Sequence, residues 1–281
     1  MNDATAGAVA DWASSQVRAV SELDGGEVGS VHRVDLTDGR RVVVKTADID
    51  LRTEAKMLTY LRSEGCLLVP DVYHVTADVL VLEFVEGNST VSSAVERDLA
   101  ERLAALHATE ADQFGFPFDT LTGAYRQPNP WTDDWAIFFG DERLGHAAKR
   151  AREDGVLQPA LAERIADLVA DLPEMLDHEP TPSLIHGDVW SANLLTDGES
   201  VQAFLDPACY YADPEVELAY AEWTEVAGED FFERYREVGS VDSGYADRKH
   251  VYRLYPLVTH VRHFGDAYLE PLAATLETIG Y

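Results

Sequence analysis

Polar side chains interrupt an otherwise apolar stretch of the sequence, SLIHGDVWSANLL at residues 183–195. Asp188 and Asn193 lie inside this stretch, and Asp206 follows the next apolar run. The residues from Asn193 to Asp206 have the pattern of a β-hairpin with an Asp-Gly pair at its centre, so we expect the three polar side chains to gather at the mouths of the same two strands. Two carboxylates and an amide oxygen are hard ligands that suit Mg²⁺ better than Zn²⁺. Phosphoryl transfer needs such a metal to neutralise phosphate charge, together with a base near the acceptor hydroxyl.

The spacing of these residues matches the catalytic loop of kinases, H-x-D-x-x-x-x-N. His186 and Asp188 supply the first two positions, and Asn193 follows Asp188 by five residues. Asp206 comes thirteen residues later, where kinases carry the aspartate of a D-F-G triplet; the triplet here is Asp-Pro-Ala. A lone His-Gly-Asp is more often a capped turn, but the complete set favours a catalytic loop with Asp188 as the base. We expect His186 to hold the loop in place, with contact to the substrate as the alternative.

The N-terminal part of the chain supplies residues that could hold a nucleotide. Lys45 ends the strand-like run RVVVK, as does the kinase lysine that holds the α- and β-phosphates. Glu54 lies early on the helix predicted next, where an ion pair would orient Lys45. Gly25, Gly26 and Gly29 precede the first predicted strand, and glycines allow backbone N–H groups to approach phosphates. Taken alone, Lys45 is more simply interpreted as a surface lysine, and the glycines as an ordinary turn.

A hinge is predicted at residues 83–87, within the run LEFVEG. The backbone groups of Glu83 and Val85 would there face the adenine of a nucleotide. The simpler interpretation is an ordinary strand that ends at a glycine.

The elements that must position these residues change character along the chain. Before the hinge, β-rich runs surround one helix; after it, the periodicity is mainly helical. We therefore predict an α+β, two-lobed, protein-kinase-like fold, with a nucleotide-binding lobe at residues 1–87 and a helical catalytic and substrate lobe at 88–281. The predicted elements are a hairpin at 30–47, a helix at 50–65, strands within 71–87, a helix after Ser92 or Ser93, a loop at 114–131, two or three helices at 131–178, a hairpin at 193–206 and helices from there to Tyr281.

The chain is strongly acidic, with 51 Asp and Glu residues against 22 Lys and Arg and a formal net charge of -29 over 281 residues. A surface of this sign repels nucleic acid and anionic membranes, so neither is expected as a partner. Only four of the basic residues are lysines. The composition is typical of proteins from salt-loving organisms, where concentrated salt screens the repulsion; an acidic protein from an ordinary source is the alternative.

Cysteine content and the absence of targeting signals favour a cytoplasmic protein. Two cysteines, Cys66 and Cys209, give neither a disulfide framework nor metal-ligand spacing, and we expect Cys209 to be a buried thiol rather than a redox switch. The first residues show no secretory signal pattern, and no apolar run approaches the ~18 residues of a membrane span.

Several longer segments carry a resemblance to a known family. The sequence resembles the fructosamine/ketosamine-3-kinase family, whose relatives are aminoglycoside phosphotransferases and choline kinases. The most specific marks are the tryptophan of H-G-D-x-W-S-x-N and the D-P-A-x-Y-Y run. The matching segments are HGDVWSANLL, FLDPACYYADPEVELA, FGF at 114–116, NPWTDDWAIFFGDERL at 129–144 and HFGDAY at 263–268.

The resemblance implies ATP- and Mg²⁺-dependent phosphorylation of a sugar hydroxyl on a ketosamine such as a fructosamine or ribulosamine, the adduct left by glycation of an amine. The phosphorylated adduct falls apart and the free amine is regenerated. Transferred to this chain, Asp188 would be the catalytic base, and Asn193 and Asp206 the magnesium ligands. Trp190 would line the acceptor pocket and pack on the sugar, with core packing as its alternative role. Lys45 and Glu54 would orient the phosphates.

The sequence departs from the family pattern at two places. The usual D-L-W-S-G-N has Val189 and Ala192 here. Downstream, the usual R-E-x-D-L-A has Pro214 in place of the arginine and Glu217 in place of the aspartate. We expect the second departure to affect the bracing of a supporting helix rather than the reaction.

The sequence is also compatible with other functions. A kinase of an aminoglycoside, choline or a free sugar is one alternative, although Trp190 and the Tyr210-Tyr211 pair favour a ketosamine. A nucleotide-binding module that has lost catalysis is another. The sequence does not distinguish free from protein-bound ketosamines and predicts no oligomeric state.

Overall fold

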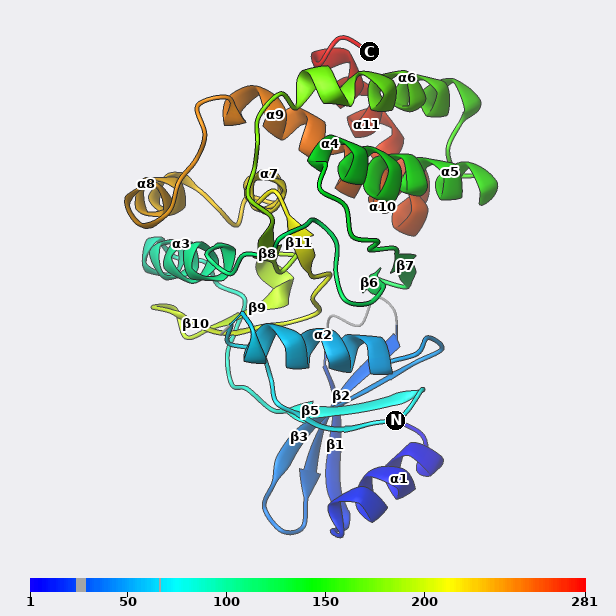
Figure 1. Cartoon of the computed structure of the whole chain (residues 1–281). Helices are drawn as coiled ribbons and strands as arrows, with labels where there is room; N and C mark the ends of the chain where they lie inside the picture. Colours follow the sequence, from blue (N-terminus) through cyan, green and yellow to red (C-terminus); the bar gives the residue numbers. More distant parts are fainter. Residues whose placement is uncertain (24–28, 66) are drawn as a thin grey trace.

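The chain is described from a computed structural model, which covers residues 1–23, 29–65 and 67–281. The N-terminal and C-terminal parts of the chain differ in secondary structure, as the sequence pattern predicts. Figure 1 shows a sheet with few helices in the N-terminal part and a mainly helical C-terminal part. Within the described residues, no helix combines the length and the apolar character that a membrane span requires.

An antiparallel five-stranded sheet forms the N-terminal lobe, in the order β1-β2-β3-β5-β4. The hairpin predicted at residues 30–47 is confirmed, and its turn contains Gly39 in a left-handed conformation with φ +92°. On β3, Lys45 lies opposite Leu80 of β5, at the centre of the sheet. The strands are β1 (Val17–Leu23), β2 (Gly29–Leu36), β3 (Arg41–Ala47), β4 (Val72–Val75) and β5 (Val79–Glu83).

Two elements precede the predicted first strand. Helix α1 (Asp3–Ala13) begins at an Asn2 cap and buries Val9 and Ala13 in a small core with the valines of β2, β3 and β5. The sequence predicted one main helix in this lobe and did not predict α1, because α1 is rich in alanine and has few large apolar residues to mark its buried face. Strand β1 is mostly exposed, which explains its weak pattern.

Helix α2 (Arg52–Ser63) covers the other face of the sheet. Its buried residues Ala55, Leu58 and Leu61 have the predicted helical spacing and belong to the main core, which continues into the C-terminal lobe. In Figure 1, α2 lies between the sheet and the helical lobe. Glu54 on its first turn lies close to the junction of the two lobes.

The C-terminal lobe contains long helices that pack around the main core. Ser92 caps the first of them by accepting a hydrogen bond from the Val95 backbone N–H at 3.2 Å, as predicted. Residues 135–153 run as one helical stretch with a π-helical centre. The helices are α3 (Ser93–His107), α4 (Trp135–Ile137), η1 (Phe138–Gly145), α5 (His146–Glu153), α6 (Pro159–Met175), α7 (Glu215–Trp223), α8 (Glu229–Val238), α9 (Tyr245–Tyr252), α10 (Leu254–Phe264), η3 (Gly265–Tyr268) and α11 (Leu269–Thr278).

Three short antiparallel pairs of strands lie where the two lobes meet. The predicted hairpin at 193–206 is confirmed as β9 (Leu194–Thr196) and β10 (Val201–Phe204). The pair of β6 (Thr120–Thr122) with β7 (Tyr125–Gln127) falls in a segment predicted as loop, and the pair of β8 (Ser183–Ile185) with β11 (Tyr210–Ala212) includes a strand in a region predicted as helical. Those predictions are wrong because a three-residue strand carries too little periodicity to be recognised.

Candidate active site

The predicted catalytic loop connects β8 to β9 and ends in the short helix η2 (Ser191–Asn193). Gly187 has φ +86°, and a Cβ atom at this position would lie 2.3 Å from the backbone oxygen of Ala208. The Ala208 N–H also donates to the carbonyl of His186 at 2.9 Å. The glycine is therefore required for the loop to lie directly against the Asp-Pro-Ala segment that carries Asp206.

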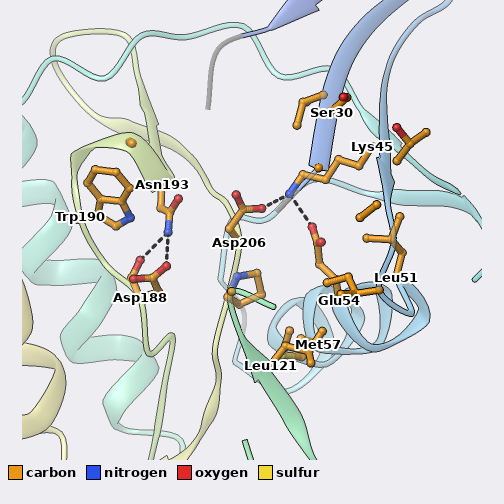
Figure 2. A pocket seen from close by; sticks show the side chains of 18 residues that line it. Ser30, Lys45, Leu51, Glu54, Met57, Leu121, Asp188, Trp190, Asn193 and Asp206 are labelled. Atoms are coloured by element: carbon orange, nitrogen blue, oxygen red, sulfur yellow. Dashed lines mark hydrogen bonds and ion pairs between the residues drawn. The ribbon is translucent and has the colours of Figure 1, made fainter. Parts of the chain in front are cut away.

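Asp188 and Asn193 are joined within this loop, as Figure 2 shows. The Asn193 side-chain amide donates to the Asp188 carboxylate at 2.7 Å and to the Asp188 backbone carbonyl at 2.9 Å. Because both hydrogen bonds use the amide nitrogen, the amide oxygen of Asn193 is left to accept a hydrogen bond or a metal ion.

Asp206 lies beyond the end of β10 in a left-handed backbone conformation, with φ +51°. This conformation is uncommon outside glycine, although aspartate tolerates it better than most residues. It directs the carboxylate toward the N-terminal lobe, where Asp206 forms an ion pair with Lys45 (Figure 2). Residues 161 positions apart in the sequence are thus brought together at the junction of the lobes.

Lys45 also pairs with Glu54, and its ammonium lies 2.7 Å from that carboxylate. The predicted ion pair between β3 and α2 is present. Burial would lower the pKa of Lys45, but the Asp206 and Glu54 carboxylates outweigh burial and raise it well above its ordinary value. Burial raises the pKa of Glu54, and Lys45 opposes that shift. Lys45 is therefore a fixed positive charge at the centre of the site.

The oxygen atoms around this pocket fit a hard divalent cation. The Asp206 side chain keeps 38% of its surface exposed, and Asn193 presents its amide oxygen. An all-oxygen donor set of this kind suits Mg²⁺. The residues present are therefore compatible with the metal that the sequence predicted.

Trp190 stands at the boundary between two neighbouring pockets. The first pocket contains Lys45, Glu54 and Asp206, and the second extends away from Asp188 toward α7 and α10. Trp190 and Asp188 line both pockets. The placement agrees with an acceptor-side role for Trp190 rather than with core packing.

Other predicted residues lie elsewhere. Gly25 and Gly26, like Cys66, fall outside the described residues. Glu83 and Val85 are half-buried and, among the described residues, are not part of the lining of the pocket that contains Lys45. The Glu83 carboxylate instead accepts a hydrogen bond from the Asp71 backbone N–H at 3.2 Å.

The cysteine and the two tyrosines of the D-P-A-x-Y-Y run are buried in the core. Tyr210 and Tyr211 of β11 are 1% and 6% exposed, so these side chains belong to the core and are not walls of either pocket. Burial raises the pKa of the Cys209 thiol far above its ordinary value, which leaves an unreactive thiol as expected.

A buried carboxylate on α7 braces the catalytic loop. Glu217 accepts hydrogen bonds from the backbone N–H groups of Gly187 at 2.6 Å and His186 at 3.2 Å. It also contacts Nε2 of His107 at 2.9 Å. Burial would raise the pKa of Glu217, but the hydrogen bond and charge of His107 outweigh it and lower the pKa. The sequence predicts Glu217 on a supporting helix but not its contact with the loop.

His186 is completely buried beneath the loop. Its Nδ1 accepts a hydrogen bond from the Asp188 backbone N–H at 3.3 Å. Burial lowers the pKa of His186, so the ring is held neutral. The structure therefore favours the predicted scaffold role over contact with substrate.

A separate cluster of His178, Asp213 and Glu215 has the composition of a metal site, but its groups are already paired. Glu215 forms two hydrogen bonds with the Arg248 guanidinium, both at 2.8 Å. Asp213 accepts from the Tyr252 hydroxyl at 2.5 Å and contacts His178 at 2.6 Å. We interpret this cluster as structural.

Comparison with known proteins extends these observations to the whole chain. The family model for fructosamine kinase matches residues 3–279. A probable ketoamine kinase of Vibrio cholerae is 33% identical over 268 residues, which cover 92% of this chain and 91% of the relative. The chloroplastic protein-ribulosamine 3-kinase of Arabidopsis thaliana is 32% identical over 192 residues, which cover 67% of this chain and 58% of the relative.

Solved structures show the same architecture. A proposed fructosamine-3-kinase of Thermobifida fusca superposes with a TM-score of 0.88 at 26% identity and covers 99% of both chains. An aminoglycoside phosphotransferase in ternary complex with AMP-PNP and hygromycin B superposes with a TM-score of 0.68 at 18% identity, over 99% of this chain and 98% of that protein. The predicted two-lobed, protein-kinase-like fold is thereby confirmed.

Proposed function

Because this chain belongs to the fructosamine kinase family, we propose that it transfers the γ-phosphate of ATP to a sugar hydroxyl of a ketosamine, with Mg²⁺ as the metal. The observation that carries the proposal is the convergence of five side chains around one pocket. The N-terminal lobe contributes Lys45 and Glu54, and the C-terminal lobe contributes Asp188, Asn193 and Asp206. Lys45 pairs with both Glu54 and Asp206, and Asn193 is hydrogen-bonded to Asp188. Each of the five has the residue type that phosphoryl transfer requires at its place.

In the proposed reaction, Asp188 acts as the base for the acceptor. Its carboxylate takes the proton of the sugar hydroxyl as the hydroxyl oxygen bonds to the γ-phosphorus. The bond from that phosphorus to the bridging oxygen breaks, and ADP leaves. Asn193 holds the Asp188 carboxylate toward the acceptor by the 2.7 Å hydrogen bond, and Glu217 fixes the loop that carries both residues.

A side chain of the N-terminal lobe neutralises part of the negative charge on the phosphates. Lys45 provides a permanently protonated amine, and Glu54 orients it. The Asn193 amide oxygen and the Asp206 carboxylate would hold Mg²⁺, which when bound supplies further neutralisation of phosphate charge. We further propose that residues 83–87 form the hinge between a nucleotide lobe at 1–87 and a substrate lobe at 88–281, with the backbone of Glu83 and Val85 toward adenine.

The biological role that follows is removal of glycation adducts. A phosphorylated ketosamine that decomposes would return the free amine, whether the amine belongs to a small molecule or to a protein. The relative from Arabidopsis thaliana is named for a protein-bound ribulosamine and for the 3-position of the sugar. We propose the same acceptor position here.

The test is a substrate panel with ATP and Mg²⁺ in concentrated KCl. Synthetic ribulosamine and fructosamine should be phosphorylated, while their 3-deoxy analogues, which lack the acceptor hydroxyl, should not. An aminoglycoside, choline and free fructose complete the panel. Phosphorylation of one of these three without turnover of either ketosamine would replace the proposal by another small-molecule kinase. Binding of ATP without turnover of any compound would favour a module that has lost catalysis.

A further inference from the structure

A pocket of about 400 Å³ opens beside the catalytic loop on the side away from Lys45. Aromatic side chains supply much of its wall, and they come from α7, α10 and η3 of the C-terminal lobe and from the catalytic loop. We refer to it as the aromatic pocket. Its principal wall residues are Trp190, Tyr220, Trp223, His260, Phe264 and Tyr268.

Apart from Trp190, these rings form one connected cluster. The His260 ring lies 5.2 Å from Trp223 and 4.8 Å from Tyr268, measured between ring centroids. Trp223 is 6.4 Å from Tyr268 at an interplanar angle of 71°. Phe264 is 45% exposed, although it is a large apolar residue. Rings that stay accessible in a pocket next to the reaction centre suit ligand binding better than core packing.

The electrostatic character of the aromatic pocket is that of a site for a cation. Asp188 is its one carboxylate, and no Lys or Arg of the described residues is part of its lining. Nδ1 of His260 donates to the Pro256 carbonyl at 2.7 Å, which leaves Nε2 as a hydrogen-bond acceptor. Burial lowers the pKa of both His260 and His263, so these rings add no positive charge at neutral pH.

We propose that the aromatic pocket binds the protonated amine of the ketosamine, and that Trp223 and Tyr268 select for that positive charge. The rings would contribute cation–π attraction, which is strongest over tryptophan. This inference rests on the proposed function and specifies which half of the substrate each pocket receives. In a ketosamine the amine is only a few bonds from the sugar hydroxyls. When the acceptor hydroxyl lies at Asp188, the amine therefore enters the aromatic pocket, because Asp188 is part of the lining of that pocket.

The experiment compares two acceptors that differ in charge but not in length. One is 1-butylamino-1-deoxyfructose, whose secondary amine is protonated at neutral pH; the other is 1-O-butylfructose, in which an uncharged ether oxygen replaces the amine. Steady-state kinetics with ATP and Mg²⁺ in concentrated KCl give kcat and KM for each acceptor with the wild type and the variants. Thermal unfolding verifies that every variant is folded.

The wild type should prefer the amine compound. Trp223→Leu should lower kcat/KM for that compound by about 5- to 30-fold, mainly through KM, and should change the ether compound much less. Trp223→Phe keeps an aromatic face and should retain most of the preference. Trp12→Leu makes the same substitution on α1, outside this pocket, and should leave both acceptors unchanged. If Trp223→Leu does not fold, Tyr268→Leu provides the same comparison.

The outcomes distinguish failure of this inference alone from failure of the proposed function. Turnover of both acceptors without preference, or a preference that survives both Trp223→Leu and Tyr268→Leu, would overturn the inference and leave the ketosamine kinase assignment standing. Absence of turnover on both acceptors and on the ribulosamine and fructosamine of the panel would overturn the proposed function and this inference together.

Discussion

Gly187 shows how a single residue can be dictated by its neighbours. Its positive φ of +86° disfavours any side chain, and the Ala208 oxygen occupies the space where a Cβ atom would stand. The sequence pattern marked the H-G-D triplet as chemical, but the reason for its glycine is a long-range contact that no local pattern contains. The same is true of Asp206, whose left-handed backbone follows from its place between β10 and the Lys45 side chain.

Gly187→Ala should therefore both destabilise and inactivate the protein. We expect the free energy of unfolding to fall by about 3 kcal/mol or more, because strain at positive φ is added to a steric clash. The matched control is Gly198→Ala, where φ is +92° but no atom lies within 4 Å of the new Cβ. That variant should lose only about 1 kcal/mol and keep its activity. Urea unfolding and turnover measure the two effects, and equal losses in the two variants would refute the close-contact explanation.

At the scale of elements, α7 braces the catalytic loop, a function that its hydrophobic pattern did not predict. Its burial and helical character could be predicted, but the direction of Glu217 toward the loop after β8 depends on how distant segments pack. The long helices α2 and α3 were predicted because each has a clear apolar face. The three-residue strands β6, β7 and β11 were missed because tertiary pairing, rather than local preference, creates them.

Glu217→Gln tests the brace. Glutamine has one acceptor oxygen in place of two, so at least one of the hydrogen bonds from the His186 and Gly187 backbone is lost. We expect kcat to fall by about 10- to 100-fold while the KM for ATP changes little. Glu215→Gln on the same helix removes the negative charge that pairs with Arg248 and is the matched control. It should lower the melting temperature without lowering kcat of the folded enzyme; equal kcat losses in both variants would contradict a specific role for Glu217.

Helix α5 offers a test on a half-buried histidine, His146. Burial and nearby arginines lower the pKa of His146. As the pH falls below about 6.5, His146 gains a proton in the unfolded chain before it does so in the folded protein, so this residue reduces stability on acidification. The unfolding free energy of His146→Gln should therefore depend less steeply on pH between about 7 and 5.5 than that of the wild type. Parallel pH curves for the two proteins would contradict the lowered pKa.

At the scale of the whole molecule, the charge of -29 should make stability depend on salt. The screening length falls from about 10 Å at 0.1 M to about 3 Å at 1 M ionic strength, which reduces repulsion between carboxylates. We predict that the protein unfolds in dilute buffer and regains its fold near molar KCl. NaCl at the same ionic strength should act similarly. Equal stability in dilute buffer would argue against a halophilic origin.

The most direct test of the assignment as a whole is the Asp188→Asn variant. Asparagine preserves the size of the side chain but cannot accept the hydroxyl proton. With a ribulosamine or fructosamine as acceptor, we expect turnover to fall at least about 100-fold, while the Kd for ATP stays within a few-fold of the wild-type value. Near-wild-type turnover by the folded variant would contradict the role of Asp188 as the catalytic base.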